Sequence, residues 1–399
     1  MALLTLVLVL AATFAAYRYF FHPLRRIPGP LLAKFTDAQR FLDTAGGRAE
    51  LTHRLLHAKY GPVVRIGPNT VSLSDPECIK LIYSNKANFP KSDFYAVNDV
   101  TQGGQRVCTL FGTRDNAFHA KLRAPIQKYY KVSELLKLEH RVDRVIEDFC
   151  GKLEGRFVKP GKPCDIAEWF LFYAWDAISD VTFSKPIKEG FLNKGGDIDD
   201  LLTTAEQALD YFAAVGQVPI LDEVLDKNPV KRIGPPSFQA AADFCVKKLI
   251  ARTTGAETND TANQDYLDHF LAIKQASDPA DGVSDATVVG WMLLNILAGA
   301  DTTATTLTAI LYYLLKHPDC YKRLQHELDA ARLPRPVPYG DAVRWRELSL
   351  FEIYKVVPMI VGAFDFELVD QKKEWELTNS WFVRVKSVDV RIKPRMLPN

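Results

Sequence analysis

Several features common in folded proteins are absent from this chain, and each absence argues against a class of protein. The six cysteines contain no C-x-x-C pair, and they are scattered at positions 78, 108, 150, 164, 245 and 320. Neither a disulfide scaffold nor a structural zinc site is therefore expected, and free thiols in a reducing compartment are the default. The 50 basic and 48 acidic residues leave a formal charge of +2, which gives no electrostatic reason to expect a nucleic-acid partner. The chain has no internal repeats, no βαβ alternation, and no G-x-G-x-x-G or Walker sequence after a strand, so the common nucleotide-binding folds are not expected.

The composition that remains is that of a folded and mainly helical protein. Of the 399 residues, 47% are hydrophobic and 25% are charged, which excludes a collagenous or broadly disordered chain and allows one large domain or two ordinary ones. A helical stretch runs from Thr44 to Tyr60, and helical patterns, among them Ala117–Tyr130, cover most of the chain from Pro76 to Gln275. Gly61–Leu73 and the alternating residues Trp381–Lys386 have the pattern of strands. These patterns predict a mainly α fold with small β-sheets near both ends of the chain.

The N-terminus has the pattern of a membrane anchor. Ala2–Tyr17 contains no charged residue. The apolar run continues past Arg18 to Phe21, and Arg25 and Arg26 follow it. Twenty helical residues rise about 30 Å, enough to cross the hydrocarbon core of a bilayer. A cleaved signal peptide and an amphipathic surface helix are the alternatives, but no basic region precedes the apolar run. We expect an anchor over residues 1–21, a basic Pro/Gly hinge over 22–30 and a body that faces the cytosol.

The best-defined element is a long helix from the N-cap Ser284 to His317, which Pro318 ends. Its first half is apolar on all sides, so we expect it to be buried. Its middle carries an acid and four threonines over Ala298–Thr306, and such groups are costly inside a core unless they have partners. Two small residues, Ala298 and Gly299, leave room beside the backbone for a large flat molecule. Two alternatives remain: satisfaction by neighbouring side chains, or a second membrane span, which the acid in mid-bilayer disfavours.

Several segments, taken in order, resemble the cytochrome P-450 monooxygenases. Ala298-Gly299-Ala300-Asp301-Thr302-Thr303 resembles the central-helix motif A/G-G-x-D/E-T-T/S of that family. The anchor followed by Pro28-Gly29-Pro30 resembles the hinge of microsomal members, and Phe89–Tyr95 resembles a fungal group that includes pisatin-demethylase-like enzymes. His119 and Arg123 lie four residues apart in a segment that is similar to the helix contacting haem propionates.

The resemblance implies a mainly α, P-450-like domain over residues 31–399 that binds haem. It assigns Asp301 and Thr302 to proton delivery, and His119, Arg123, Ala298 and Gly299 to the cofactor; it assigns no iron ligand in this chain. It further implies an NADPH-dependent flavoprotein reductase, a lipophilic small-molecule substrate, and a single-pass protein of the endoplasmic reticulum membrane. The expected reaction is hydroxylation or oxidation of a hydrophobic compound, with O2, in fungal secondary metabolism.

One segment that the family requires is missing. The haem-thiolate loop Phe-x-x-Gly-x-x-x-Cys-x-Gly is absent, as is Glu-x-x-Arg, and Cys320 is the only cysteine after the central helix. Leu348–Pro358 and Gly362–Glu367 nevertheless look like the helix and strand that follow that loop. The sequence therefore predicts an internal deletion near residues 346–349, on the order of a hundred residues, comparable to a small domain.

Three interpretations remain open for such a chain. It is an internally deleted haem-thiolate monooxygenase or a faulty gene model of one; a non-catalytic, membrane-anchored remnant without haem; or an unrelated helical membrane protein. For the chain as written, we expect no haem-thiolate complex. We also expect the deletion to leave apolar surface of the long helix uncovered.

Overall fold

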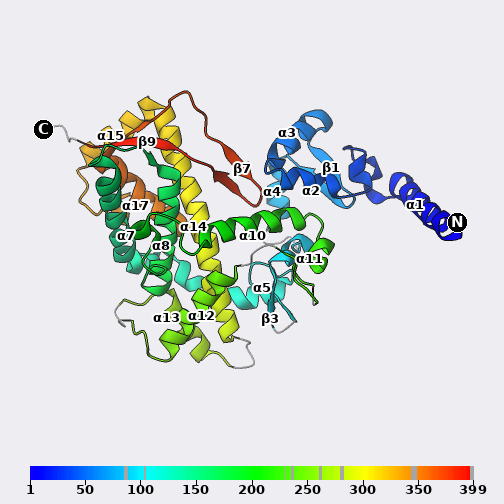
Figure 1. Ribbon diagram of the computed structural model, residues 1–399, viewed down its shortest axis with the longest axis horizontal. Coiled ribbons are helices and arrows are strands. Elements are labelled where there is room, and N and C mark those ends of the chain that lie inside the picture. Colours follow the sequence, from blue (N-terminus) through cyan, green and yellow to red (C-terminus); the bar gives the residue numbers. More distant parts are fainter. Residues whose placement is uncertain are drawn as a thin grey trace. The chain divides into compact units, whose positions relative to one another are not determined.

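The computed structural model describes residues 1–84, 89–102, 105–228, 230–234, 238–259, 263–278, 283–342 and 348–395. The fold is mainly α, with small β-sheets (Figure 1). The α-helices are α1 Ala2–Phe20, α2 Ala38–Ala45, α3 Ala49–Tyr60, α4 Glu77–Ile82, α5 Asn116–Arg123, α6 Val132–Leu135, α7 Glu139–Leu153, α8 Ile166–Phe183, α9 Phe191–Lys194, α10 Leu201–Val215, α11 Ile220–Val224, α12 Gln239–Thr253, α13 Tyr266–Ala276, α14 Asp285–Lys316, α15 Pro318–Ala331, α16 Tyr339–Ala342 and α17 Leu348–Ala363.

The strands form short pairs and one three-stranded sheet. They are β1 Val63–Gly67, β2 Thr70–Leu73, β3 Val100–Gln102, β4 Gln105–Val107, β5 Cys164–Asp165, β6 Phe364–Leu368, β7 Leu377–Asn379, β8 Val383–Val385 and β9 Asp389–Pro394. β1 pairs with β2, β3 with β4 and β7 with β8, while β9 lies between β5 and β6. The fold class predicted from the sequence is therefore confirmed.

The chain divides into two compact units. The first comprises residues 1–116, 207–235 and 378–382, and the second comprises 117–206, 236–377 and 383–399. The chain passes between the units several times, so no single boundary separates them. The anchor, the hinge and one P-450-like domain over residues 31–399 stay a prediction.

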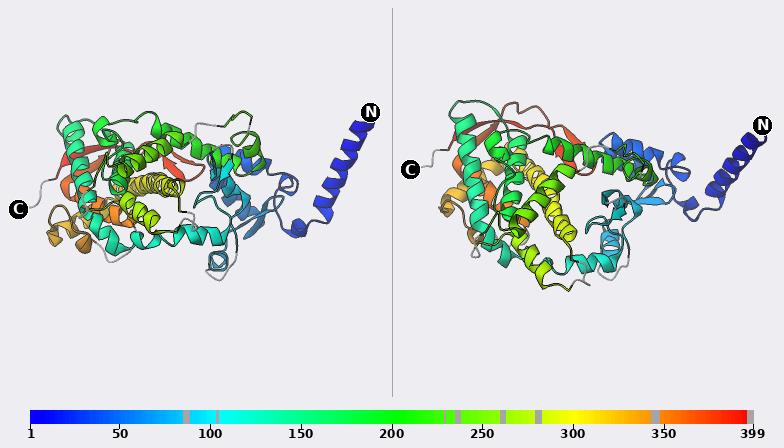
Figure 2. Two further views of the ribbon diagram at one scale, coloured as in Figure 1. Left: turned by 90° about the horizontal axis from the view of Figure 1, so that it is seen from below. Right: turned by 60° about the horizontal axis from the view of Figure 1, so that its bottom comes forward.

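The long helix α14 forms the centre of the second unit. It packs most extensively against α8 and also contacts α12, α13 and α17; Figure 2 shows it among these helices. The N-cap predicted at Ser284 is present and forms a capping box, because Ser284 and Thr287 bond each other's backbone N–H groups. Gly299 allows α8 to approach closely, since a Cβ atom at Gly299 would lie 2.9 Å from two side-chain carbons of Ile178.

In the first unit, α1 is tied to the β1–β2 hairpin. The Arg18 guanidinium donates to Oδ1 of Asn69 at 3.1 Å, and the His22 ring lies 3.1 Å from the same oxygen. Behind them, the Arg65 N–H donates to the Pro28 carbonyl at 2.7 Å. The residue after Pro28 must be glycine, because a Cβ at Gly29 would meet the Arg65 carbonyl oxygen at 2.1 Å.

Two expectations from the sequence need correction. The helix predicted from Thr44 to Tyr60 is broken, because α2 ends at Ala45 and α3 begins at Ala49. Gly47 separates them with a φ of 71°, in the left-handed region that glycine adopts easily. The helix predicted for residues 117–130 similarly ends with α5 and continues as a 3-10 turn.

The surface of α14 meets its expectation in part. We expected uncovered apolar side chains: Val288, Trp291, Met292 and Ile296 are buried, whereas Val289, Leu293, Leu294 and Leu297 are partly exposed. The exposed positions in the middle of the helix are small or carry hydroxyls, namely Ala298, Thr302 and Thr306. An open face of that composition costs little in water, because it exposes little apolar area.

Candidate functional site

Asp301 lies half-buried in the middle of α14, against α8. Its Oδ1 accepts a hydrogen bond from the indole N–H of Trp175 at 3.1 Å. Burial raises the pKa of Asp301 to about 6, while the Trp175 hydrogen bond and the charge of Arg384 partly offset this rise, and the charge of Glu206 adds to it. A carboxyl group with this pKa exchanges its proton near neutral pH, as a general acid or base must.

The next residue, Thr302, is exposed on a different side of the helix. Its hydroxyl donates to the Ala298 carbonyl at 2.8 Å, and the Thr306 hydroxyl donates to the Thr302 carbonyl at 2.8 Å. Successive residues of an α-helix point about 100° apart, and here Asp301 and Thr302 bond different partners. The structure therefore places the predicted acid and alcohol next to each other in the chain but on different sides of α14, each bonded to its own partner.

The two small residues predicted beside the cofactor differ in their surroundings. Ala298 is exposed on the same face as Thr302, whereas the position of a Gly299 side chain is filled by Ile178 of α8. The structure thus gives Gly299 a role in helix packing. A role of either residue in cofactor binding stays a prediction.

His119 and Arg123 lie on α5, one turn apart. His119 is half-buried and Arg123 is exposed, while Leu122 between them is buried and fixes the helix. Asp301 and Thr302 are bonded to α8 and to the backbone of α14, so these bonds do not join them to α5. The role of His119 and Arg123 toward a cofactor stays a prediction.

Sequence reasoning missed the neighbours of Asp301. Trp175 comes from α8, and Arg384 comes from β8, where its Nε lies 3.4 Å from Oε1 of Glu206. β8 is held against α14 by the Thr305 hydroxyl, which donates to the Val383 carbonyl at 3.2 Å. The only sequence signals were a tryptophan inside an apolar helix and an arginine in an alternating strand, and neither reveals its partner.

A second buried acid lies behind the same helix. Glu352 of α17 is 2% exposed, and burial raises its pKa to about 8, an effect that the nearby Thr303 hydroxyl partly offsets. Three residues later, Lys355 is fully buried and pairs with the carboxylates of Glu139 and Asp143. Of the two buried groups, only Lys355 is matched by opposite charge within the described residues.

Comparison with known proteins decides the family. The family model for cytochrome P-450 matches residues 16–343 of the chain. This chain belongs to the cytochrome P-450 family.

Its relatives are fungal proteins of that family. The cytochrome P-450 monooxygenase cfoH of Aspergillus candidus is 29% identical over 486 residues, covering 94% of this chain and 89% of cfoH. The monooxygenase cicH of Emericella nidulans is 29% identical over 494 residues, covering 98% of both chains. The monooxygenase mpaDE of Penicillium roqueforti is 36% identical over 333 residues, covering 80% of this chain but only 38% of mpaDE. The chain thus matches little more than a third of mpaDE.

The family implies a haem cofactor, and the cysteines test whether this P-450 chain can hold one through a thiolate. All six lie among the described residues, and all are free thiols. Burial raises the pKa values of Cys150 and Cys245 to about 12 and that of Cys164 further, so none of the three is an activated thiolate. Of the others, Cys78 lies on α4 and Cys108 follows β4, while Cys320 is exposed in the first turn of α15. No cysteine follows Cys320 in the sequence. The cysteines of this chain therefore do not fit a haem-thiolate site.

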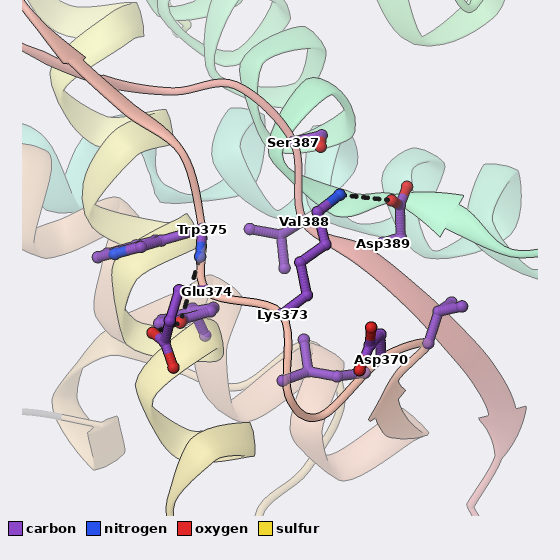
Figure 3. A pocket seen from close by; sticks show the side chains of 10 residues that line it. Asp370, Lys373, Glu374, Trp375, Ser387, Val388 and Asp389 are labelled. Atoms are coloured by element: carbon purple, nitrogen blue, oxygen red, sulfur yellow. Dashed lines mark hydrogen bonds and ion pairs between the residues drawn. The ribbon is translucent and has the colours of Figure 1, made fainter.

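A separate hollow of about 230 Å³ lies near the end of α14 (Figure 3). Its residues bond one another: the Tyr312 hydroxyl donates to Oε2 of Glu374 at 2.6 Å, and Nζ of Lys373 points toward Asp389, 3.9 Å from Oδ2. Tyr312 is ten residues beyond Thr302, about 15 Å along the helix. This hollow is therefore separate from the acid and alcohol of the P-450 motif.

Proposed function

We propose that this chain carries the proton-handling half of a P-450 monooxygenase site and lacks the half that ligates iron. The observation that carries the proposal is the pair on α14: a half-buried Asp301 with a pKa of about 6, followed by an exposed Thr302. In this family haem supplies the activation of oxygen. The complete enzyme would hydroxylate or oxidise a lipophilic small molecule of fungal secondary metabolism, with electrons from an NADPH-dependent flavoprotein reductase.

The two residues suit the movement of protons. Asp301 takes up and releases a proton near neutral pH, because its pKa is about 6. The Thr302 hydroxyl donates to a backbone carbonyl, so its oxygen remains free to accept a hydrogen bond from water on the exposed face. Such an arrangement transfers protons between Asp301 and a molecule beside Thr302 through an intervening water.

The second candidate is a membrane-anchored remnant without haem, and the length of the match supports it. The alignment with cicH runs over 494 residues, at least 95 more than the 399 of this chain, although it covers 98% of both proteins. Some of the relative's residues therefore have no counterpart here. The deletion that we propose near residues 346–349 falls partly outside the described residues, which omit 343–347.

Two forms of the chain separate the candidates. The first is the 399-residue protein, and the second carries the cysteine-containing segment of cicH inserted between Glu347 and Leu348. After reconstitution with haem, reduction and exposure to carbon monoxide, we expect the thiolate-type band only in the second form. A Cys→Ser change in the insert is the control and should abolish the band.

Each result decides between definite alternatives. A thiolate band from the 399-residue protein would contradict the absence of an iron ligand. Failure of the inserted form to give the band would remove the monooxygenase proposal and leave the remnant. Sequencing the transcript across Arg346–Ser349 shows whether the deletion belongs to the gene product.

A further inference from the structure

We propose that Trp175 is a positioning residue for Asp301: its indole N–H holds the carboxyl group on the α8 side of α14, while the Thr302 hydroxyl lies on another side of the helix. The importance of this contact for proton transfer rests on the proposed function. The contact itself does not, and it is tested separately below.

The indole is held rigidly enough to impose a position on its partner. Trp175 is 1% exposed, and its ring packs on that of Phe191, with centroids 5.7 Å apart. One turn later, the Ser179 hydroxyl donates to the Trp175 carbonyl at 2.7 Å. Close packing of Gly299 against Ile178 fixes the approach of α8 to α14 near this contact. The carboxyl group therefore adapts to the indole, because the indole has no room to move.

The hydrogen bond between Trp175 and Asp301 also satisfies both groups. An indole has a single donor and no acceptor, and when buried it normally finds a partner. Trp291 of α14 provides a comparison, since it is equally buried but its Nε1 has no hydrogen-bond partner among the described residues. Loss of the Asp301 contact would leave the Trp175 N–H in the same unsatisfied state.

The charged groups around Asp301 do not replace this contact. Among the described residues, Arg384 of β8 and Glu206 of α10 are the charged groups that act on its carboxyl group, and they are paired with each other. The acids of α8 face elsewhere, since Asp176 accepts from the backbone at the start of α9 and Asp180 pairs with arginines of α7. The buried acid of α17, Glu352, lies by Thr303. Trp175 is thus the neutral donor that favours the ionised form of Asp301.

Tryptophan fluorescence against pH tests the contact in the full chain, in detergent and without haem. The emission of an indole changes when its hydrogen-bonded carboxyl group titrates, so we expect a transition centred near pH 6 in the unaltered protein. The transition should be absent in Trp175→Phe, which removes the reporter and its N–H, and in Asp301→Asn, which keeps an acceptor but does not titrate. Trp291→Phe is the matched control and should retain the transition.

A second measurement follows the pH dependence of unfolding. Trp175→Phe should shift the titration of Asp301 upward by about one pH unit, because the ionised form loses its donor. This shift should vanish in the Asp301→Asn background, where only the packing cost of the substitution remains. A fluorescence transition that persists in Trp175→Phe, or an equal shift in both backgrounds, would overturn the proposal.

The consequence for proton transfer requires the form with the inserted cysteine segment. There, Trp175→Phe should shift the pH profile of product formed per O2 consumed, whereas Trp291→Phe should leave it unchanged. If the fluorescence and unfolding results hold but this profile does not move, the contact stands and the proton-handling role of Asp301 in the proposed function is wrong.

Discussion

At the residue scale, two buried ionisable side chains of α17 act in opposite ways on stability. Lys355 is fully buried, but its ammonium group has two carboxylates beside it and also donates to the Val337 carbonyl at 2.8 Å. Glu352 has no ion pair among the described residues, and burial raises its pKa to about 8. A buried charge is tolerated when it is paired and destabilises when it is not.

Replacement of Glu352 by Gln should therefore stabilise the protein at alkaline pH. Because the pKa of Glu352 is raised above its ordinary value of 4.5, the native state holds a proton that the unfolded state releases, and stability falls as pH rises from about 4.5 through about 8. Above that range Glu352→Gln should raise the free energy of unfolding by about 2–4 kcal/mol, with little effect at about pH 4. Urea denaturation at both pH values measures this, and equal effects at the two would contradict it.

Substitution of the neighbouring Lys355 should change the free energy of unfolding in the opposite direction. Lys355→Gln leaves Glu139 and Asp143 without their cation, and we expect it to lower the free energy of unfolding by about 3–5 kcal/mol at neutral pH. The same denaturation measurement applies. A loss below about 1 kcal/mol, the usual value of an exposed pair, would show that water reaches this cluster.

In the sequence, single residues stood out where they break a pattern and did not stand out where they depend on a partner. Asp301 stood out because it interrupts an apolar helix, and the structure gives it a raised pKa. Trp175 and Arg384 did not stand out, because a tryptophan in an apolar helix and an arginine in a strand both fit their local pattern. Their importance arises only when α8 and β8 pack on α14, which local periodicity does not encode.

At the element scale, local sequence was sufficient to predict where α14 begins and ends but not what it packs against. Ser284 and Pro318 marked the ends of the helix because capping and proline geometry act over a few residues. At Gly299, which the sequence suggested as space for a flat molecule, the side chain of Ile178 on α8 approaches closely. Local periodicity does not reveal this contact.

Two glycine substitutions on α14 should separate packing from helix propensity. Gly299→Ala places a Cβ 2.9 Å from Ile178, so we expect a loss of about 1–2 kcal/mol in the free energy of unfolding despite alanine's better propensity. Gly290→Ala is the control, because nothing lies within 4 Å of its Cβ, and it should gain up to about 1 kcal/mol. Thermal or urea denaturation measures both.

Truncation of the opposing side chain completes this test. Ile178→Ala alone leaves a cavity and should cost about 2–4 kcal/mol. Combined with Gly299→Ala it should cost less than the sum of the two single changes, since the new methyl group occupies part of the space. Strict additivity would mean that the two helices do not meet at this point.

At the scale of the whole molecule, the order of motifs along the chain was enough to predict the family, which the family match over residues 16–343 confirms. The division into two units could not be predicted, because the first unit takes residues 207–235 and 378–382 from distant parts of the chain. The deletion that we propose leaves no residues to interpret. It is indicated by the sequence on its C-terminal side, where Leu348–Pro358 and Gly362–Glu367 look like the helix and strand that follow the haem-thiolate loop.

The anchor is the remaining prediction for the whole molecule. Among the described residues, α1 is the one helix long and apolar enough to cross a membrane, and its large apolar side chains are exposed. Arg18, near its end, is bonded to Asn69 of the β1–β2 turn. We infer that the bilayer ends just before Arg18, since a charge held by the folded body cannot lie at the centre of the bilayer.

Deletion of residues 1–21 should therefore move the protein from the carbonate-resistant membrane fraction to the supernatant or to aggregates. A gentler variant, Leu8→Arg with Leu10→Arg, should have the same effect, because each arginine at the centre of the span costs about 2.5–3.5 kcal/mol of insertion free energy. Leu31→Arg with Leu32→Arg is the matched control: these two leucines are equally exposed, at 63% and 61%, but lie outside α1, so the membrane fraction should not change. Membrane retention that survives the arginines in α1 but is lost with those at 31 and 32 would place the attachment on the folded body instead of the helix.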